Sequence, residues 1–294
     1  MKKTSPFSVG AIYVLLGAML WGTTGTSQAL APEGAGPLSV GALRIVIGGA
    51  ALLAIALARG SFAGTGPWPL LPTAAAVVSM AAYQPLFFTG AAMTGVAVGT
   101  LVTLASCPVI TGVLAYAFFR ERPGGRWYVS SAMARAGCTL LILSGGEAEA
   151  SDPVGMLFSL GAGFSYSVFV LSSKRLLMER GADAVNGLVF SAAGLLLLPG
   201  LLAYPPSWLL QLRGILVAAH LGLVATALAY FLFLKGLSAI PASTGVTLTM
   251  AEPLTASLLG VFLLGERLGG TGAAGAAMLF LGLAFLAAGK NKED

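Results

Sequence analysis

Ten apolar segments of about 20 residues each follow one another along the chain, and this pattern constrains the fold more than any other feature. A helix rises about 1.5 Å per residue and the hydrocarbon core of a bilayer is about 30 Å thick, so a helix of about 20 apolar residues crosses it. The sequence lacks the alternation of an outer-membrane barrel. It therefore predicts an all-α integral membrane protein with ten transmembrane helices. These cover approximately residues 8–30, 38–58, 70–92, 97–119, 126–145, 154–173, 185–204, 214–234, 242–264 and 271–289.

The composition supports the membrane assignment. Hydrophobic residues make up 57% of the chain and charged residues only 9%, whereas a soluble domain has about a quarter charged residues. The apolar run from Val9 to Leu30 is too long for a cleaved secretory signal, so we expect a retained first helix. Cys107 and Cys138 both fall in apolar segments and are expected to be buried thiols rather than a disulfide. The basic residues are scattered, so the net charge of +5 does not indicate nucleic-acid binding.

The basic residues also predict the orientation of the chain in the membrane. If the N-terminus is inside, the cytoplasmic stretches hold 12 lysines and arginines and the external ones only Arg213 and Arg267. The remaining two, Arg44 and Arg135, lie within apolar segments. Cytoplasmic loops are normally the positively charged ones. We therefore expect both termini in the cytoplasm and a multi-pass protein of the bacterial inner membrane.

An internal repeat divides the chain. The sequence SCPVITGVLAYAFFRERPGG surrounds Pro108, and AEPLTASLLGVFLLGERLGG surrounds Pro253. The two prolines are 145 residues apart, as are Glu121 and Glu266. We expect each proline to break its helix, and the freed backbone carbonyls are tolerated only beside protein or water.

The repeat predicts two five-helix halves, residues 1–145 and 146–294, that form one transport domain. Because five is odd, the second half enters the membrane inverted relative to the first. Inverted repeats place a substrate site near the middle of the membrane, where the halves meet.

Each half ends with P-x(12)-E-R before a glycine pair, and the first span contains Leu20-Trp21-Gly22. With the two five-span halves, these motifs resemble the drug/metabolite transporter superfamily and, within it, the EamA family. The chain looks most similar to bacterial amino-acid exporters of the aromatic-amino-acid type. The resemblance implies a basket-shaped bundle whose central cavity is lined by spans 1, 3, 4, 6, 8 and 9, with spans 5 and 10 peripheral. One departure is that Trp21 corresponds to Tyr166, so the second half lacks this tryptophan.

Polar and aromatic residues within the spans are the candidate substrate contacts. Some share one helix face, as residues 21, 24 and 28 do at spacings of three and four. Rings with hydroxyl groups suit a zwitterion with an apolar side chain, although each residue can instead pack between helices. The predicted substrate-binding residues are Trp21, Thr24, Gln28, Ser79, Tyr83, Phe87, Thr103, Ser106, Tyr166, Thr226, Tyr230, Thr249 and Glu252.

Ionisable residues inside spans are functional candidates by default. Glu252, near the middle of span 9 and directly before Pro253, and His220 in span 8 are the proton-coupling candidates. Arg44 lies near the outer end of span 2, so we expect its side chain to snorkel and to have a structural role. No role is assigned to Arg135.

The predicted function is secondary transport: export of neutral and aromatic amino acids or related small metabolites by alternating access. The alternatives are a passive facilitator or uniporter for other small metabolites and an intramembrane enzyme. The sequence contains no GxxxxGK[ST] motif and only one histidine, so we expect no ATPase, catalytic residues, cofactor or metal site. The expected partners are a small-molecule substrate and the lipid bilayer, with no nucleic acid. The expected state is a monomer or weak homodimer.

Overall fold

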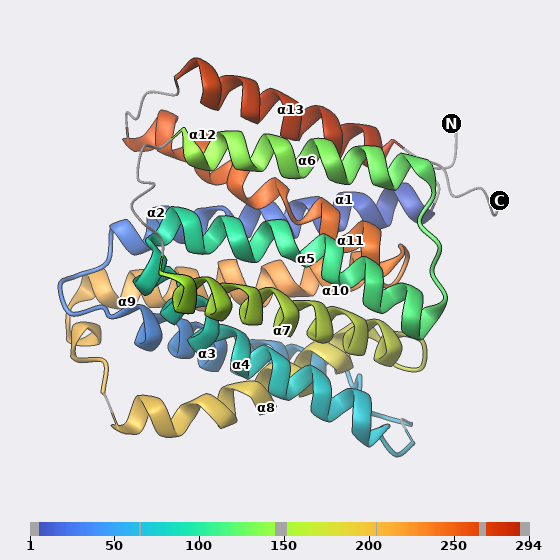
Figure 1. Ribbon diagram of the computed structural model, residues 1–294. Coiled ribbons are helices and arrows are strands. Elements are labelled where there is room, and N and C mark those ends of the chain that lie inside the picture. The colour runs from blue at the N-terminus through green and yellow to red at the C-terminus, as the bar shows by residue number, and fades with distance from the viewer. Residues whose placement is uncertain (1–5, 65, 145–151, 204, 265–268, 289–294) are drawn as a thin grey trace.

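The computed structural model describes residues 6–64, 66–144, 152–203, 205–264 and 269–288, and throughout these ranges the secondary structure is helical, without strands (Figure 1). The α-helices are α1 Pro6–Trp21, α2 Thr23–Ala29, α3 Pro37–Ala58, α4 Leu70–Thr94, α5 Val96–Phe119, α6 Gly125–Leu143, α7 Pro153–Leu177, α8 Ala182–Ala203, α9 Leu212–Ala219, α10 Ala229–Leu237, α11 Ala242–Leu248, α12 Ala251–Leu264 and α13 Gly270–Ala287. A 3₁₀ helix, η1, covers Ser207–Leu210, and a π-helix, η2, covers His220–Leu228. The all-α membrane fold is confirmed.

In the described ranges, nine helical segments are long and apolar enough to cross a membrane. They include three spans built from more than one element: α1 with α2, α9 with η2 and α10, and α11 with α12. Helix α6 is not among the nine. Its 19 residues include Arg126 and Arg135, which reduce its apolar character. It packs along α13, however, and so occupies the place of the fifth of the ten expected spans.

Equivalent helices of the two halves pack against each other. Helices α3 and α8 correspond by the offset of 145, and Gly49 of α3 approaches the carbonyl group of Phe190 in α8. A Cβ atom at Gly194 would lie 3.2 Å from Cα of Val46. As the residue number rises along α3 it falls along α8, so the pair is antiparallel. Two copies of one helix that pack antiparallel are related by a rotation axis across the helices, as inverted repeats require.

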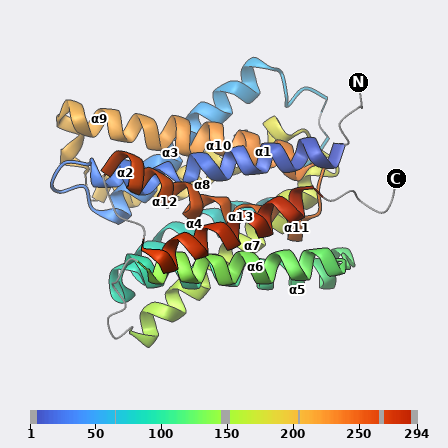
Figure 2. The same ribbon diagram turned by 90° about the horizontal axis from the view of Figure 1, so that it is seen from above.

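Helices α6 and α13 repeat this arrangement, and both Figure 1 and Figure 2 show α13 beside α6. A Cβ at Gly137 would lie 2.5 Å from the amide nitrogen of Leu279, and one at Gly282 would lie 3.1 Å from that of Ala134. Glycine therefore permits close contact of the two backbones. In Figure 1 this pair lies at the opposite side of the bundle from α3 and α8, with α1, α5, α7 and α10 between the two pairs. The start of α1 and the end of α13 lie at the same end of the bundle, as an even number of spans requires. The boundary between the halves, near residue 145, falls outside the described residues and stays a prediction.

The helix breaks differ from those predicted at the two repeated prolines. Helix α5 runs through Pro108 without interruption, so the predicted break there is wrong. In span 9 the break lies at Thr249 and Met250, and Pro253 is in the first turn of α12. A proline in the first turn removes an N–H that has no helical partner, whereas a proline inside a helix removes a bond to the carbonyl four residues earlier. In α5 that carbonyl belongs to Leu104.

Glu121, from the repeated E-R pair, joins the two halves at the end of the bundle where α5 ends and α11 begins. Its carboxylate accepts hydrogen bonds from the backbone N–H groups of Ala242 and Ser243 at 3.1 and 3.4 Å, and from the Ser243 hydroxyl at 3.2 Å. The indole of Trp127 donates nearby to the Ser243 carbonyl and the Thr247 hydroxyl, both at 3.1 Å. Glu121 thus caps the first half of span 9 with a side chain from the other repeat. Its counterpart Glu266 lies outside the described residues.

Candidate functional site

A cavity with about 470 Å³ of atom-free space, part of it open to solvent, lies at the junction of the two halves. We call it the central cavity. Seven spans contribute to its wall: spans 1, 2, 3, 4, 6, 8 and 9. The lining residues are Trp21, Thr24, Arg44, Tyr83, Thr103, Leu104, Cys107, Tyr166, Tyr230, Thr249 and Glu252. Spans 5 and 10 contribute none of these residues, as expected for peripheral helices.

Aromatic rings form one wall of the central cavity. The ring centroid of Trp21 lies 4.7 Å from that of Tyr230 and 6.3 Å, edge to face, from that of Tyr166. Tyr83 continues the wall at 5.8 Å from Tyr166. Phe233 packs behind Trp21 at 5.3 Å. Rings that pack on one another in this way hold a rigid apolar surface.

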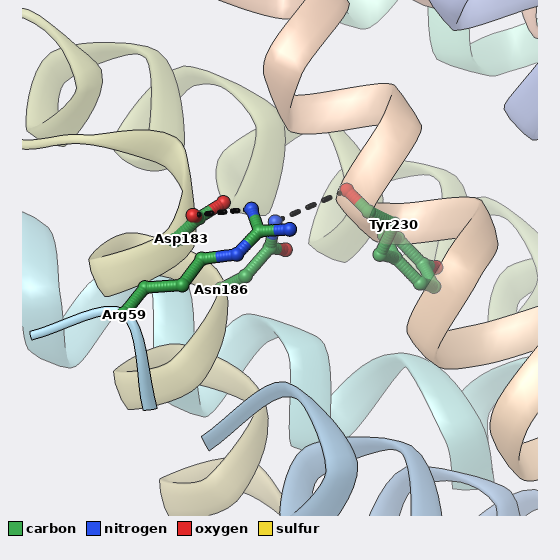
Figure 3. Close-up of polar contacts among 4 residues, drawn as sticks. All are labelled: Arg59, Asp183, Asn186 and Tyr230. Atoms are coloured by element: carbon green, nitrogen blue, oxygen red, sulfur yellow. Dashed lines mark hydrogen bonds and ion pairs between the residues drawn. The ribbon is translucent and has the colours of Figure 1, made fainter. Parts of the chain in front are cut away.

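A buried amide holds Tyr230 in place. The side-chain nitrogen of Asn186 in α8 donates to the Tyr230 carbonyl at 3.3 Å, and Figure 3 shows the tyrosine ring directed away from Asn186. In the same view, Arg59 at the end of α3 pairs with Asp183 at the start of α8 at 2.9 Å. These contacts link α3, α8 and α10 below the aromatic wall.

Several polar atoms of the wall have no protein partner. The indole nitrogen of Trp21, the hydroxyl of Tyr166 and the hydroxyl of Thr24 are buried and form no hydrogen bond with any residue that the structure describes. Trp21 is only 5% exposed and Tyr166 only 7%. A buried polar group without a partner costs about 1–3 kcal/mol. These groups are therefore available to hydrogen-bond a molecule in the central cavity.

Arg44 brings a positive charge into the central cavity. Its Nε donates to the Thr226 hydroxyl at 3.0 Å, and one Nη donates to the Ala225 carbonyl at 3.2 Å. Thr226 in turn donates to the Leu221 carbonyl, five residues earlier in the π-helix η2. Since a guanidinium has five N–H groups, three remain for other partners. The Arg44 side chain therefore does not snorkel to the membrane surface as expected. Its hydrogen bonds to η2 direct the guanidinium inward.

Glu252 brings a negative charge. It is the second residue of α12, directly after the break in span 9, and its side chain is half-buried. No residue in the described ranges hydrogen-bonds or ion-pairs with its carboxylate. Its backbone contacts the break in span 1, since a Cβ at Gly22 would lie 2.7 Å from the Glu252 carbonyl oxygen. The two broken spans therefore meet beside this carboxylate, and Gly22 permits the contact.

The sequence profile of the EamA-like transporter family matches residues 8–143 and again residues 153–288. The chain belongs to this family. The two matches are offset by 145 residues, the same interval that separates Pro108 from Pro253. This EamA-like protein is therefore a multi-pass membrane transporter of small molecules built from two repeats, and not an enzyme.

Relatives of this EamA-like transporter agree with the assignment. The chain is 45% identical over 287 residues to the "Uncharacterized transporter YwfM" of Bacillus subtilis (strain 168), covering 97% of this chain and 96% of that protein. It is 29% identical over 197 residues to the "Threonine/homoserine exporter RhtA" of Escherichia coli (strain K12), covering 63% of this chain and 64% of that protein. One solved crystal structure matches with a TM-score of 0.81 at 21% identity, over 94% of this chain and 95% of that one, and shows the fold.

Eight of the thirteen residues predicted to bind substrate line the central cavity of this EamA-like transporter: Trp21, Thr24, Tyr83, Thr103, Tyr166, Tyr230, Thr249 and Glu252. The hydroxyls of Thr103 and Thr249 donate to the backbone carbonyls of Ser159 and Val246. They therefore offer only lone pairs to a ligand. Their assignment as substrate contacts stays a proposal.

The other five predicted residues lie outside the lining: Gln28, Ser79, Phe87, Ser106 and Thr226. Phe87 stacks on Tyr83 at 5.7 Å, and Thr226 holds Arg44, so both support the wall from behind. Ser79 and Ser106 hydrogen-bond to carbonyls of their own helices. Each four-residue step turns a helix face by about 40°, so residues spaced by four from Tyr83 point progressively away from the cavity.

The sequence missed three lining residues, Arg44, Leu104 and Cys107. The repeat contains the signal for two of them, because Leu104 corresponds to Thr249 and Cys107 to Glu252 by the offset of 145. His220 does not line the cavity. Its Nε2 lies 2.9 Å from the Thr23 hydroxyl in α2. Its role in proton coupling stays a prediction.

Proposed function

We propose that this transporter exports neutral and aromatic amino acids, or closely related small metabolites, across the bacterial inner membrane by alternating access. The observation that carries this proposal is the central cavity: an apolar aromatic wall with a few unpartnered polar atoms, at the junction of two repeats. A pocket that combines aromatic surface with a few convergent polar groups is typical of small-molecule sites. In inverted-repeat transporters the substrate binds at such a junction.

A further observation supports the amino-acid class. The relative from Escherichia coli is named as an exporter of threonine and homoserine, which are small neutral amino acids.

Alternating access requires contacts between the halves that form at one end and release when the other end closes. The hydrogen bonds of Glu121 and Trp127 to α11 are contacts of this kind, because each joins the first repeat to the second. Polar contacts exchange partners with water more readily than a packed apolar core. We propose that they hold the cytoplasmic end closed in this conformation.

The orientation proposed here, with both termini in the cytoplasm, rests on the distribution of basic residues. Ser61, after α3, is then cytoplasmic, and Glu33, an exposed residue before α3, is external. Single cysteines at these positions in a background without Cys107 and Cys138 should react with an impermeant maleimide from opposite sides of the membrane. Labelling of residue 61 in intact cells would contradict the proposed orientation.

Counterflow in proteoliposomes tests the proposed function. Vesicles loaded with an unlabelled amino acid should transiently accumulate the labelled form, because a carrier exchanges substrate and a channel does not. The panel includes threonine, phenylalanine, glutamate and lysine, with and without a pH gradient. Accumulation of the neutral and aromatic members is expected. Equilibration without counterflow would favour the passive alternative, and no flux of any amino acid would overturn the proposed substrate class.

Glu252 is the proposed proton-coupling group, with His220 the second candidate. A carboxyl group at the meeting point of two broken spans can exchange its proton when the cavity opens to either side. Coupling predicts that a pH gradient drives accumulation of the substrate. A wild-type protein that shows counterflow but no response to the gradient would be a uniporter.

A further inference from the structure

The central cavity contains two opposite charges that do not pair with each other. Arg44 and Glu252 both line it, yet the ion pairs between residues in the described ranges are Arg59–Asp183 and Arg175–Glu179. Both of those pairs lie at helix ends outside the cavity, and Figure 3 shows the first of them. Charges within a membrane protein normally pair or serve function. The presence of Arg44 and Glu252 in the cavity therefore needs an explanation that the two ion pairs at helix ends do not.

Each of the two charged residues is attached to a different part of the fold. The two hydrogen bonds to η2 hold the Arg44 guanidinium. Glu252 is held by the first turn of α12 and by the close contact of its backbone with Gly22. In this conformation the two side chains form no ion pair with each other, and both can bind a third group.

The repeat makes this arrangement one-sided. By the offset of 145, Arg44 corresponds to Val189 and Glu252 corresponds to Cys107. Neither counterpart is charged. The pseudo-twofold axis therefore relates each charge to an uncharged residue, so that the cavity has one positive side and one negative side. A ligand with two opposite charges fits such a site in one orientation.

We propose that Arg44 binds the α-carboxylate and Glu252 the α-ammonium group of an amino-acid zwitterion, so that transport requires both groups on the substrate. This rests on the proposed function and specifies its substrate class. A guanidinium with free N–H groups binds a carboxylate through paired hydrogen bonds. The carbonyl of Leu104, released from its helical bond by Pro108, is a further acceptor for the ammonium group.

The remaining wall determines which side chains are accepted. Trp21, Tyr166 and Tyr230 offer apolar ring surface, and the Trp21 indole and Tyr166 hydroxyl offer hydrogen bonds to a polar side chain. The lining contains no third charged residue in the part of the chain that the structure describes. A third charge on the substrate would thus be buried without a partner. The site selects zwitterions with uncharged side chains.

Substrate analogues test the proposal in the wild-type protein, without any substitution. Counterflow of labelled threonine or phenylalanine is measured against three competitors: the free amino acid, its methyl ester and its N-acetyl derivative. The ester lacks the carboxylate and the N-acetyl compound lacks the ammonium group. A site with buried polar groups rejects a ligand that leaves one of them unpaired. Each derivative should compete at least about tenfold more weakly than the free amino acid.

Substitutions then assign each charge to one group. Arg44→Gln should remove the discrimination against the methyl ester while retaining that against the N-acetyl derivative. Glu252→Gln should have the reverse effect. A structural role for either residue would lower all rates without changing these ratios. Arg175→Gln and Glu179→Gln, at an exposed ion pair of the α7 end, are matched controls and should leave both ratios unchanged.

The outcomes separate this proposal from the one on which it rests. If the methyl ester and the N-acetyl derivative inhibit counterflow as strongly as the free amino acid does, the zwitterion site is overturned, whereas amino-acid export is not. Absence of amino-acid flux in the wild type would overturn both. If Arg44→Gln elutes as aggregate, Arg44→Lys replaces it. Lysine retains the positive charge but not the paired N–H geometry, so ester discrimination should fall partway.

Discussion

The two repeats reach the central cavity at equivalent places but in different ways. In the first half, Gly22 interrupts span 1 and α5 runs through Pro108. In the second half, α7 is continuous and span 9 breaks before Pro253. Among these four spans, each half thus has one broken span and one continuous span, and the broken spans are not equivalent. The repeat sets the shared architecture, and differences at single positions make the site asymmetric.

One pair of contacts shows this at atomic detail. Ser167 corresponds to Gly22, and Cys107 corresponds to Glu252. The Ser167 hydroxyl lies 3.4 Å from the Cys107 carbonyl oxygen, while a Cβ at Gly22 would lie 2.7 Å from the Glu252 carbonyl oxygen. Equivalent contacts therefore occur twice across the junction of the halves, and at Gly22 the contact is too close for a side chain. The comparison indicates that the broken spans approach each other more closely than the continuous ones.

The largest effect is expected from a side chain at the closer contact. Gly22→Val would place atoms within 2.6–2.7 Å of Thr255 and the Glu252 carbonyl. Overpacking of this kind costs about 1–3 kcal/mol. Transport should be lost because the Glu252 side chain moves, and the melting temperature should fall. Ser167→Ala is the matched variant, and should cost only about 1 kcal/mol, the value of one hydrogen bond. Equal effects at both positions would show that the two contacts are equivalent after all.

A second prediction compares the residues at the proton-coupling position. Glu252→Gln should flatten the dependence of transport on pH, because the amide cannot take up a proton. Cys107→Ser, at the equivalent position, should retain the wild-type profile. Transport is measured as counterflow at each pH, with matched vesicle interiors. A wild-type profile in Glu252→Gln would remove this carboxyl from the coupling mechanism and leave His220 as the candidate.

A third prediction compares the two equivalent aromatic residues of the wall. Trp21→Phe and Tyr166→Phe each delete an unpartnered polar atom and retain most of the ring surface. If these atoms hydrogen-bond the substrate, each change should weaken apparent affinity by about 0.5–1.5 kcal/mol, up to about tenfold. The fold should be intact, since neither atom has a partner in the described structure. Unchanged affinity in both variants would assign these residues to packing.

The smallest effect is expected at the contact between halves. Glu121→Gln keeps the shape of the cap on α11 but removes its charge, which should weaken the interaction with the helix N-terminus by about 0.3–1 kcal/mol. The balance between the two access states should shift severalfold toward the cytoplasm-open state. Reaction of Ser243→Cys with an impermeant maleimide, in inside-out vesicles, measures this. If Ser243→Cys reacts more slowly in the Glu121→Gln background than with Glu121 present, Glu121 does not help to close the cytoplasmic end.

Much of the fold follows from the sequence, because the signals that determine it are local apolar runs and motifs that repeat along the chain. Apolar runs of helical length predicted the spans, and the interval of 145 residues predicted the two halves that the antiparallel pairs α3–α8 and α6–α13 display. The polar and aromatic residues within spans also identified eight of the eleven residues that line the central cavity. A polar side chain inside an apolar run has few places to point except a cavity.

The tertiary structure alone decided that the site contains a positive charge. By position in its span, Arg44 belongs to the outer end of α3, and only the π-helix η2, distant in sequence, directs it inward through Thr226 and Ala225. Likewise, the break in span 9 lies at Thr249 and Met250 rather than at Pro253. Local sequence encodes which segments cross the membrane, but the direction of a long side chain depends on hydrogen-bond partners that only packing brings within reach.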